Sequence, residues 1–150
     1  MTRGVTISRA DVGRVPDVAR LFDAYRSFFA GRSTLDRCTE FLRDRLTADE
    51  SVVFVADADD GAVGFAQLYP LWSSWYCERI WFLSDLYVAE PARKAGAGSQ
   101  LIEAVKVFAA QTSASSVMVE LPRAEPHLER FYARLGFVKD DVFELARYKG

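Results

Sequence analysis

The sequence has 150 residues, the length of one ordinary domain, and a chain of this size buries roughly 68–70% of its unfolded surface. Half of the residues are hydrophobic, 27% are charged and the net charge is −2, which excludes the clustered positive charge of a nucleic-acid binder. The cysteines, Cys38 and Cys77, lack metal-ligand or disulfide-framework spacing, and no apolar run approaches the roughly 18 residues of a membrane span. We expect a single domain over residues 1–150, in the cytoplasm, with neither nucleic acid nor membrane as a partner.

The first 50 residues predict a short strand and two helices. Residues 5–7 form the strand, and Asp11 and Pro16 mark the start of the first helix. One face of that helix carries an apolar stripe with a 3.6-residue period: Val18, Leu21, Phe22, Tyr25, Phe28 and Phe29. Gly31 ends this helix, and Ser33 with Asp36 predicts a capping box for a second helix.

A β-hairpin follows, with strands at residues 52–56 and 63–69 and a turn signal at 59–61. Pro70 is expected to close or bend the second strand. Residues 71–77 combine aromatic and polar side chains, which is typical of a loop or strand edge lining a cleft. Two interpretations stay open for Trp72, Trp75 and Tyr76, because such aromatics either pack or contact a substrate.

Residues 80–88 predict a long strand that is apolar on both faces, as a central strand is. Asp85 interrupts it. Because side chains alternate along a strand, Asp85 should share one side with Trp81, Leu83 and Tyr87 unless a bulge intervenes. A carboxylate in such a run is either a hydrogen-bonded structural residue or a contact for an amine substrate.

The stretch Arg93-Lys-Ala-Gly96-Ala-Gly98 is a basic loop that opens directly into an amphipathic helix ending near Thr112. Backbone N–H groups at a helix N-terminus bind anions, and the loop adds two cationic side chains. The sequence therefore predicts a phosphate-binding loop that suits a pyrophosphate.

The C-terminal part predicts a strand over residues 116–121 and a helix that begins at Pro126 and ends at Gly136. Residues 137–138 and 142–148 are expected to add the last strands.

This order of elements, with Arg-x-x-Gly-x-Gly opening the central helix, resembles the GNAT superfamily of acetyl-coenzyme A-dependent N-acetyltransferases. Two motifs carry the resemblance: Asp85-Leu-Tyr-Val-x-x-Pro-x-Arg93-x-x-Gly96-x-Gly98 and Phe131-Tyr-Ala-Arg-Leu-Gly-Phe137. The resemblance implies an α/β (α+β) fold, with a mixed, mostly antiparallel central sheet flanked by helices and a splayed fourth and fifth strand pair. It also implies acetyl-CoA as the cosubstrate, with no metal.

Residue roles follow from the same resemblance. The coenzyme would be held by the strand end and the loop, at Leu86, Tyr87, Val88, Arg93, Lys94, Ala95, Gly96, Ala97, Gly98 and Ser99. Tyr132 matches the family's general acid for the departing thiolate. Asp85 or Glu120 is expected to take the proton of the amine through water or to bind it as a cation. Many members carry an Asn where this chain has Glu125, followed by Pro126 and His127, so a side-chain contact to the coenzyme at that position is not expected.

The acceptor is expected to be a primary amine of a small basic molecule, such as a polyamine or an amino acid, that attacks the thioester directly in a ternary complex. A mildly acidic protein is compatible with a cationic substrate. The substrate pocket is expected near Tyr25, Trp72, Trp75, Asp85 and Tyr87, where charge and cation–π contacts suit an alkylammonium. Two alternatives stay open: acetylation of a protein lysine or N-terminus, and a non-catalytic acyl-CoA-binding module. Small relatives of this kind imply a homodimer.

Overall fold

The computed structural model describes residues 4–150, and within them five strands form one sheet in the order β1-β2-β3-β4-β5. The strands are β1 (Thr6–Arg9), β2 (Val52–Ala58), β3 (Gly61–Ser73), β4 (Glu78–Val88) and β5 (Ser116–Val119). Neighbours pair antiparallel from β1 to β4, whereas β4 and β5 are parallel. The predicted mixed, mostly antiparallel sheet is confirmed.

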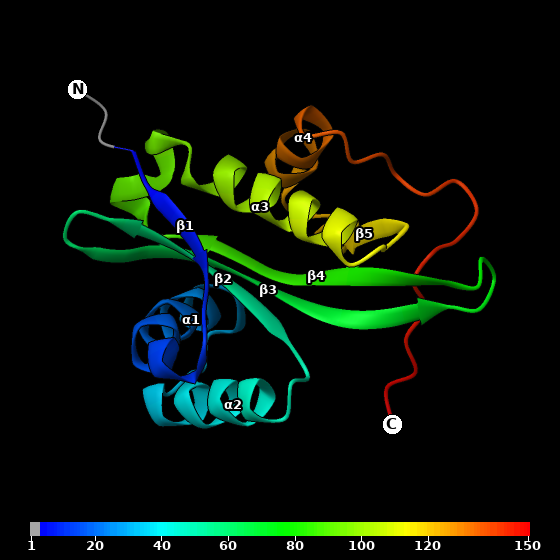
Figure 1. Cartoon of the computed structure of the whole chain (residues 1–150). Coiled ribbons are helices and arrows are strands. Elements are labelled where there is room, and N and C mark those ends of the chain that lie inside the picture. The colour runs from blue at the N-terminus through cyan, green and yellow to red at the C-terminus, as the bar shows by residue number, and fades with distance from the viewer. Residues whose placement is uncertain (1–3) are drawn as a thin grey trace. The chain divides into compact units, whose positions relative to one another are not determined.

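Helices cover both faces of this sheet. The 3-10 helix η1 (Val12–Arg14) leads into α1 (Val15–Ala30), which lies with α2 (Leu35–Thr47) on one face, and η2 (Glu90–Ala95) leads into α3 (Ala97–Gln111) on the other (Figure 1). The ring of Phe22 in α1 lies 5.9 Å from that of Phe65 in β3, and Phe108 in α3 lies 5.6 Å from Phe54 in β2. We call these two sides the α1 face and the α3 face.

Contacts divide the chain into two compact units, residues 1–120 and 121–150, and each is described by itself. The prediction of one domain over residues 1–150 stays a prediction. The first unit holds the sheet with α1, α2 and α3. The second holds α4 (Pro126–Arg134), which begins at a proline and is followed by Gly136 with a φ of 93°. Both ends agree with the sequence pattern.

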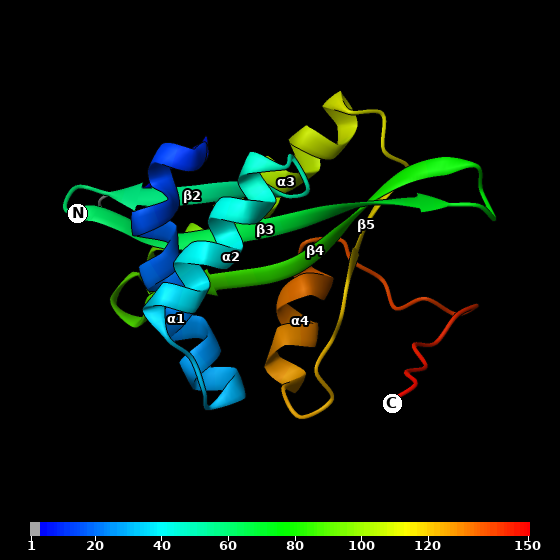
Figure 2. The same cartoon turned by 90° about the horizontal axis from the view of Figure 1, so that it is seen from below.

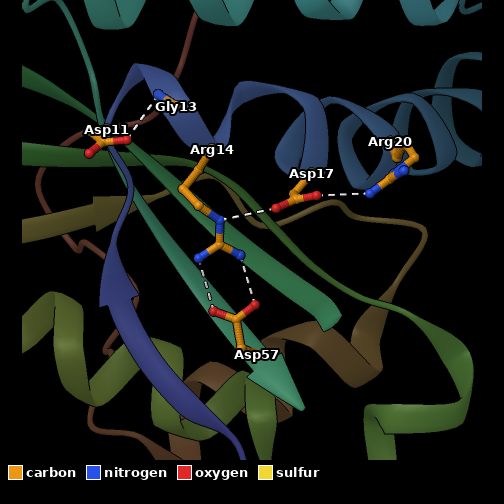
Figure 3. Close-up of polar contacts among 6 residues, drawn as sticks. All are labelled: Asp11, Gly13, Arg14, Asp17, Arg20 and Asp57. Carbon is orange, nitrogen blue, oxygen red and sulfur yellow. Dashed lines mark hydrogen bonds and ion pairs between the residues drawn. The ribbon is translucent and has the colours of Figure 1, made fainter. Parts of the chain in front are cut away.

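The start of α1 is tied to the end of β2 by a bidentate ion pair. Arg14 donates through Nη1 and Nη2 to the two carboxylate oxygens of Asp57, at 3.1 and 2.7 Å, and through Nε to Asp17 at 3.1 Å (Figure 3). The hydrogen bond to Asp57 raises the pKa of Arg14 above its ordinary value. Asp11 caps η1, as predicted, by accepting from the backbone N–H of Gly13 at 2.9 Å.

Three local predictions are wrong. The cap of α2 is Thr34, which accepts from the N–H of Arg37, whereas the Ser33 hydroxyl lies 3.3 Å from Cys38 Sγ. Of the two outcomes expected at Pro70, an end to the strand is wrong, since β3 continues to Ser73, while a bend there stays a prediction. Beyond Leu68 the strand pairs only with β4, so the missing N–H of Pro70 costs no ladder bond on the β2 side.

The predicted strands over residues 137–138 and 142–148 are also absent from the part of the chain that the structure describes. Asp140 instead makes a turn, in which its carboxylate accepts from the N–H groups of Val142 and Phe143 at 2.7 and 2.9 Å. These hydrogen bonds lower the pKa of Asp140. A strand needs a paired neighbour, and within residues 121–150 the structure contains no other strand.

Candidate active site

The predicted phosphate-binding loop lies at the junction of η2 and α3. Gly96 has a φ of 78°, a left-handed conformation that favours glycine, and a Cβ built there would meet no atom within 4 Å. α3 begins directly afterwards, without a capping side chain among the described residues. The N–H groups in the first turn of a helix have no intrahelical partner, so Ala97, Gly98 and Ser99 bring backbone donors to this junction, next to Ala95.

The side chain of Arg93 is turned back onto the sheet. Its Nε donates to the carbonyl of Val88 at 2.8 Å, and its guanidinium lies 5.8 Å from the centre of the Tyr87 ring. Arg93 therefore fixes the loop to the end of β4, and the carbonyl of Val88, one of the predicted coenzyme residues, already accepts this hydrogen bond. The side chain of Lys94 lies outside the described part of the structure.

β4 extends beyond the end of β5. The parallel pairing runs from Ile80 with Ser116 to Leu83 with Val119, and β4 then continues to Val88 without a partner on that side among the described residues (Figure 2). This is the expected splay of the fourth and fifth strands. The backbone of Leu86 to Val88 lies along the unpaired stretch, so it is available for an extended ligand such as a coenzyme arm.

A β-bulge decides where Asp85 points. Gln67 of β3 pairs with Asp85 and Leu68 pairs with Leu83, so Ser84 is the extra residue of β4. The bulge reverses the alternation that the sequence predicted. Trp81 and Leu83 consequently lie on the α3 face, where Trp81 packs 5.0 Å from Phe108, while Asp85 lies on the α1 face with Gln67.

Tyr25 and Tyr87 meet at Asp85 on the α1 face. The Tyr25 ring lies 6.0 Å from that of Tyr87 and 6.1 Å from that of Phe65. Gln67 donates through Nε2 to Asp85 Oδ2 at 3.0 Å. The structure thus brings together three of the five predicted substrate residues: Tyr25, Asp85 and Tyr87.

Burial dominates the electrostatics of Asp85 and raises its pKa above the ordinary value for an aspartate. Hydrogen bonds from Gln67, Ser84 and Tyr25 act in the opposite direction, and the charge of Glu120, directly after β5, raises the pKa further. A carboxyl whose pKa is raised toward neutrality is a stronger base than an exposed one. Glu120, the second predicted base candidate, therefore acts electrostatically on Asp85, the first.

Tyr69 also belongs to this group, although the sequence did not single it out. Burial raises its pKa to about 12, and the charge of Asp85 adds to the effect. Gln67 and Ser84 were missed as well. Alternation along β3 would have placed Gln67 and Tyr69 on one face, but only the bulge adds Asp85 to it.

The other two predicted substrate residues lie elsewhere. Trp72 pairs with Arg79 near the end of the β3–β4 hairpin, about 17 Å along the strand from Gln67. Trp72 and Trp75 are 70% and 74% exposed, and in both views the hairpin extends past α1, α2 and α3 (Figures 1 and 2). The structure does not bring them together with Asp85, because the paired strands carry them away from it, and their contact with a substrate stays a prediction.

Tyr132 belongs to the second unit and lies in α4. It is buried, with its ring 5.2 Å from that of Phe131 and 5.3 Å from that of Phe137. At the start of the helix, Glu125 Oε2 and His127 Nδ1 are 3.3 Å apart. The role of Tyr132 as general acid stays a prediction.

Comparison with known proteins decides the family. The sequence profile of the acetyltransferase (GNAT) family matches residues 16–137. The chain belongs to the GNAT family. It is 34% identical over 139 residues to the uncharacterized N-acetyltransferase YhfO of Bacillus subtilis (strain 168), covering 93% of each chain. It is 30% identical over 104 residues to an aminoglycoside N(6')-acetyltransferase type 1 of Serratia marcescens, covering 67% of this chain and 71% of that one.

Among solved structures, a probable acetyltransferase is 33% identical, with a TM-score of 0.90 over 96% of this chain and 97% of the other. This GNAT chain is therefore an acetyl-CoA-dependent N-acetyltransferase, and the resemblance seen in its two motifs is confirmed. Within residues 4–150, no group of three or more His, Cys, Asp or Glu side chains is arranged to hold a metal ion. None of the helices described there combines the length and apolar composition needed to cross a membrane.

Proposed function

We propose that this GNAT enzyme acetylates the primary amine of a small basic molecule, with Asp85 receiving the amine. The observation that carries the proposal is the half-buried carboxylate of Asp85 beside the unpaired end of β4, with the rings of Tyr25 and Tyr87 next to it. A carboxylate with aromatic neighbours attracts an alkylammonium through charge and cation–π contact. A relative named for acetylating aminoglycosides supports a small amine as the acceptor.

Acetyl-CoA supplies an activated acetyl group as a thioester. The features of the donor site fit it: the open Gly96 turn, the uncapped N-terminus of α3 and the unpaired edge of β4. Backbone N–H groups from Arg93 to Ser99 would hold the pyrophosphate, and the edge from Leu86 to Val88 would hold the arm. A backbone N–H aimed at the thioester carbonyl stabilises the charge that develops there during attack, without reorganisation.

An alkyl amine must lose a proton before it attacks. With a pKa of about 10.4, well under 1% of the amine is neutral at pH 7, so proton removal adds roughly 4–5 kcal/mol to the barrier. In our proposal Asp85 takes this proton, directly or through water, and Glu120 adds negative charge that favours a cationic substrate. The raised pKa of Asp85 supports this assignment.

At the other end of the reaction the departing thiolate needs a proton, and Tyr132 is proposed to donate it. Tyr132→Phe removes only the hydroxyl, so we expect turnover to fall by about a hundredfold or more while coenzyme binding is kept. Steady-state kinetics and calorimetric titration with coenzyme A would measure the two effects separately. Unchanged turnover with retained binding would remove Tyr132 from the mechanism.

The function as a whole is tested by the release of coenzyme A thiol with a panel of acceptors: polyamines, amino acids, aminoglycosides and peptides. We expect saturable release with at least one small amine and little with peptides. Preferred peptides would favour the alternative of a protein acetyltransferase, which needs an open groove. Saturable coenzyme binding without release from any acceptor would favour a non-catalytic acyl-CoA-binding module.

A homodimer is also proposed, on the resemblance to small acetyltransferases of basic amines. Analytical ultracentrifugation at micromolar concentration would measure its mass, and a monomer across that range would contradict it.

A further inference from the structure

Gln67 is a polar side chain in a place where the fold alone favours an apolar one. It is fully buried at the centre of β3, opposite Val53 of β2 and two residues from Phe65. Its Oε1 has no hydrogen-bond partner among the residues that the structure describes. Burying an amide with an unsatisfied oxygen costs free energy, whereas leucine or methionine would fit the same space without that cost. A buried polar residue that costs folding free energy calls for a functional explanation.

Among the described residues, the side chain of Gln67 makes its hydrogen bond to Asp85. Nε2 donates to Oδ2 at 3.0 Å, and the two residues are direct partners across the β3–β4 pair. The pair stands at the bulge, where Ser84 shifts the register and turns Asp85 to the α1 face. The backbone irregularity and the buried amide thus act on the same carboxylate.

We propose that Gln67 is a positioning residue for Asp85, whose carboxylate it holds in one orientation through the Nε2–H···Oδ2 hydrogen bond. This inference rests on the proposed function, because it assigns Gln67 a role through the residue that receives the amine. The terminal torsion of an aspartate is soft, so an unrestrained carboxylate rotates broadly. A donor that is itself fixed by burial restricts this rotation, and catalytic groups need such restraint to within about 10–20°.

Several groups face Asp85 and share control of its charge. They come from four parts of the first unit: Tyr25 from α1, Gln67 and Tyr69 from β3, Ser84 and Tyr87 from β4, and Glu120 after β5. Gln67 differs from the others because it is fully buried, so water cannot replace its N–H when it is removed. Losing this donor disfavours the carboxylate, which raises the pKa of Asp85 and moves the acid limb of the pH–rate profile to higher pH.

The first experiment is the pH profile of kcat/KM for Gln67→Met, which keeps the size of the side chain and removes the amide. We expect the acid limb to move up by about one pH unit, since one hydrogen bond to a charged group is worth about that much. At pH values on the acid limb, kcat/KM of the variant should be about tenfold lower than that of the wild type, and it should recover at higher pH. An unmoved acid limb in a folded variant would overturn the proposal.

Val53→Ala is the matched control. Val53 is fully buried directly opposite Gln67, so its truncation disturbs the same core without touching a donor to Asp85. It should lower the Tm and leave the acid limb in place. If Val53→Ala moved the limb as far as Gln67→Met does, general loosening of the core would explain both results, and the positioning role would be rejected.

A second readout does not depend on turnover. The carboxyl carbon of Asp85 can be titrated by NMR in the wild type, Gln67→Met and Gln67→Glu. We expect an upward shift in Gln67→Met and a larger one in Gln67→Glu, where two adjacent carboxyls share a proton. If the wild type acetylates no amine, the proposed function fails while this titration still decides the role of Gln67. An Asp85 titration that is the same in all three proteins would refute it.

Discussion

The β3–β4 pair contains two regions of similar composition and different character. The inner half, residues 64–69 and 82–88, lies between α1 and α3 and carries Asp85, Gln67 and Tyr69. The hairpin tip, residues 71–80, carries Trp72, Trp75 and Tyr76, which are 58–74% exposed. Both regions are rich in aromatic side chains and both contributed residues to the predicted substrate pocket. Of the two regions, the inner half has the buried polar contacts that shift the pKa of a carboxylate, that of Asp85.

The difference shows that aromatic content alone does not locate a site. In the inner half, burial raises the pKa of the Asp85 carboxyl, and Gln67 gives it a specific hydrogen-bond partner. At the hairpin tip the same kinds of side chain face solvent, and the guanidinium of Arg79 stacks 4.3 Å from the Trp72 ring. Substitutions in the two regions therefore have different expected effects.

The largest effect is expected on activity from Asp85→Asn. The amide is nearly isosteric but is no base and carries no charge, so kcat/KM should fall by about two to four orders of magnitude. The matched substitutions at the hairpin tip, Trp72→Ala and Trp75→Ala, should change it less than about twofold. Steady-state kinetics of the three variants with one amine measures the contrast. Equal losses at Asp85 and Trp72 would restore the single pocket that the sequence predicted.

The second contrast concerns stability. Phe65 is fully buried, with rings of Phe22 and Tyr25 at 5.9 and 6.1 Å, so Phe65→Ala should cost about 3–5 kcal/mol of unfolding free energy. Trp72→Ala removes a larger but exposed ring and should cost about 1 kcal/mol or less. Urea unfolding followed by fluorescence compares them. A cost at Trp72 close to that at Phe65 would mean that the tip is buried in solution, as in a dimer.

Much of this arrangement could be predicted from the sequence because local rules determine it. The apolar period of α1, the glycines that follow α1 and α4, and the motif from Asp85 to Gly98 each report on neighbours within a few residues. The turn at Gly96 and the helix that follows it were predicted for that reason, while the phosphate-binding role of this loop stays a prediction. The periods of the helix and the strand likewise placed Tyr25 and Tyr87 on defined faces.

The features that the sequence did not predict depend on pairing between segments that are distant along the chain. The bulge at Ser84 reverses the alternation of side chains along β4 but leaves no signal in the sequence of that strand, so the partners of Asp85 could not be predicted from β4 alone. Pro70 is tolerated within β3 because β2 begins only at Val52, opposite Leu68, and the sequence of β3 does not reveal this starting point. The apolar residues near Val142 fit a strand, but the turn at Asp140 prevails where no partner strand is present in the second unit.

A third prediction concerns Tyr69, at the outer end of the inner half. Its pKa is raised from about 10 to about 12, so the folded state disfavours the ionised phenol. The contribution of this residue to the free energy of unfolding is complete below pH 10 and is lost as the pH rises to 12, by about 1–2 kcal/mol once solvent screening of this partly exposed group is allowed for. Tyr69→Phe should lose less stability over this interval in urea unfolding, while Tyr76→Phe at the hairpin tip should follow the wild type. Identical slopes for all three proteins would contradict the assignment.

The smallest expected effect tests whether a side-chain contact within the hairpin tip contributes to stability. The guanidinium of Arg79 lies between Trp72 and Trp81, at 4.3 and 5.5 Å from their ring centres. A double-mutant cycle of Arg79→Met and Trp72→Ala should give a coupling of about 0.5–1 kcal/mol, the usual value for an exposed cation–π pair. The methionine keeps the apolar stem of the arginine, so the cycle isolates the charge on the ring. A coupling of zero would mean that the stack adds nothing to stability, and the contrast with the inner half would then be complete.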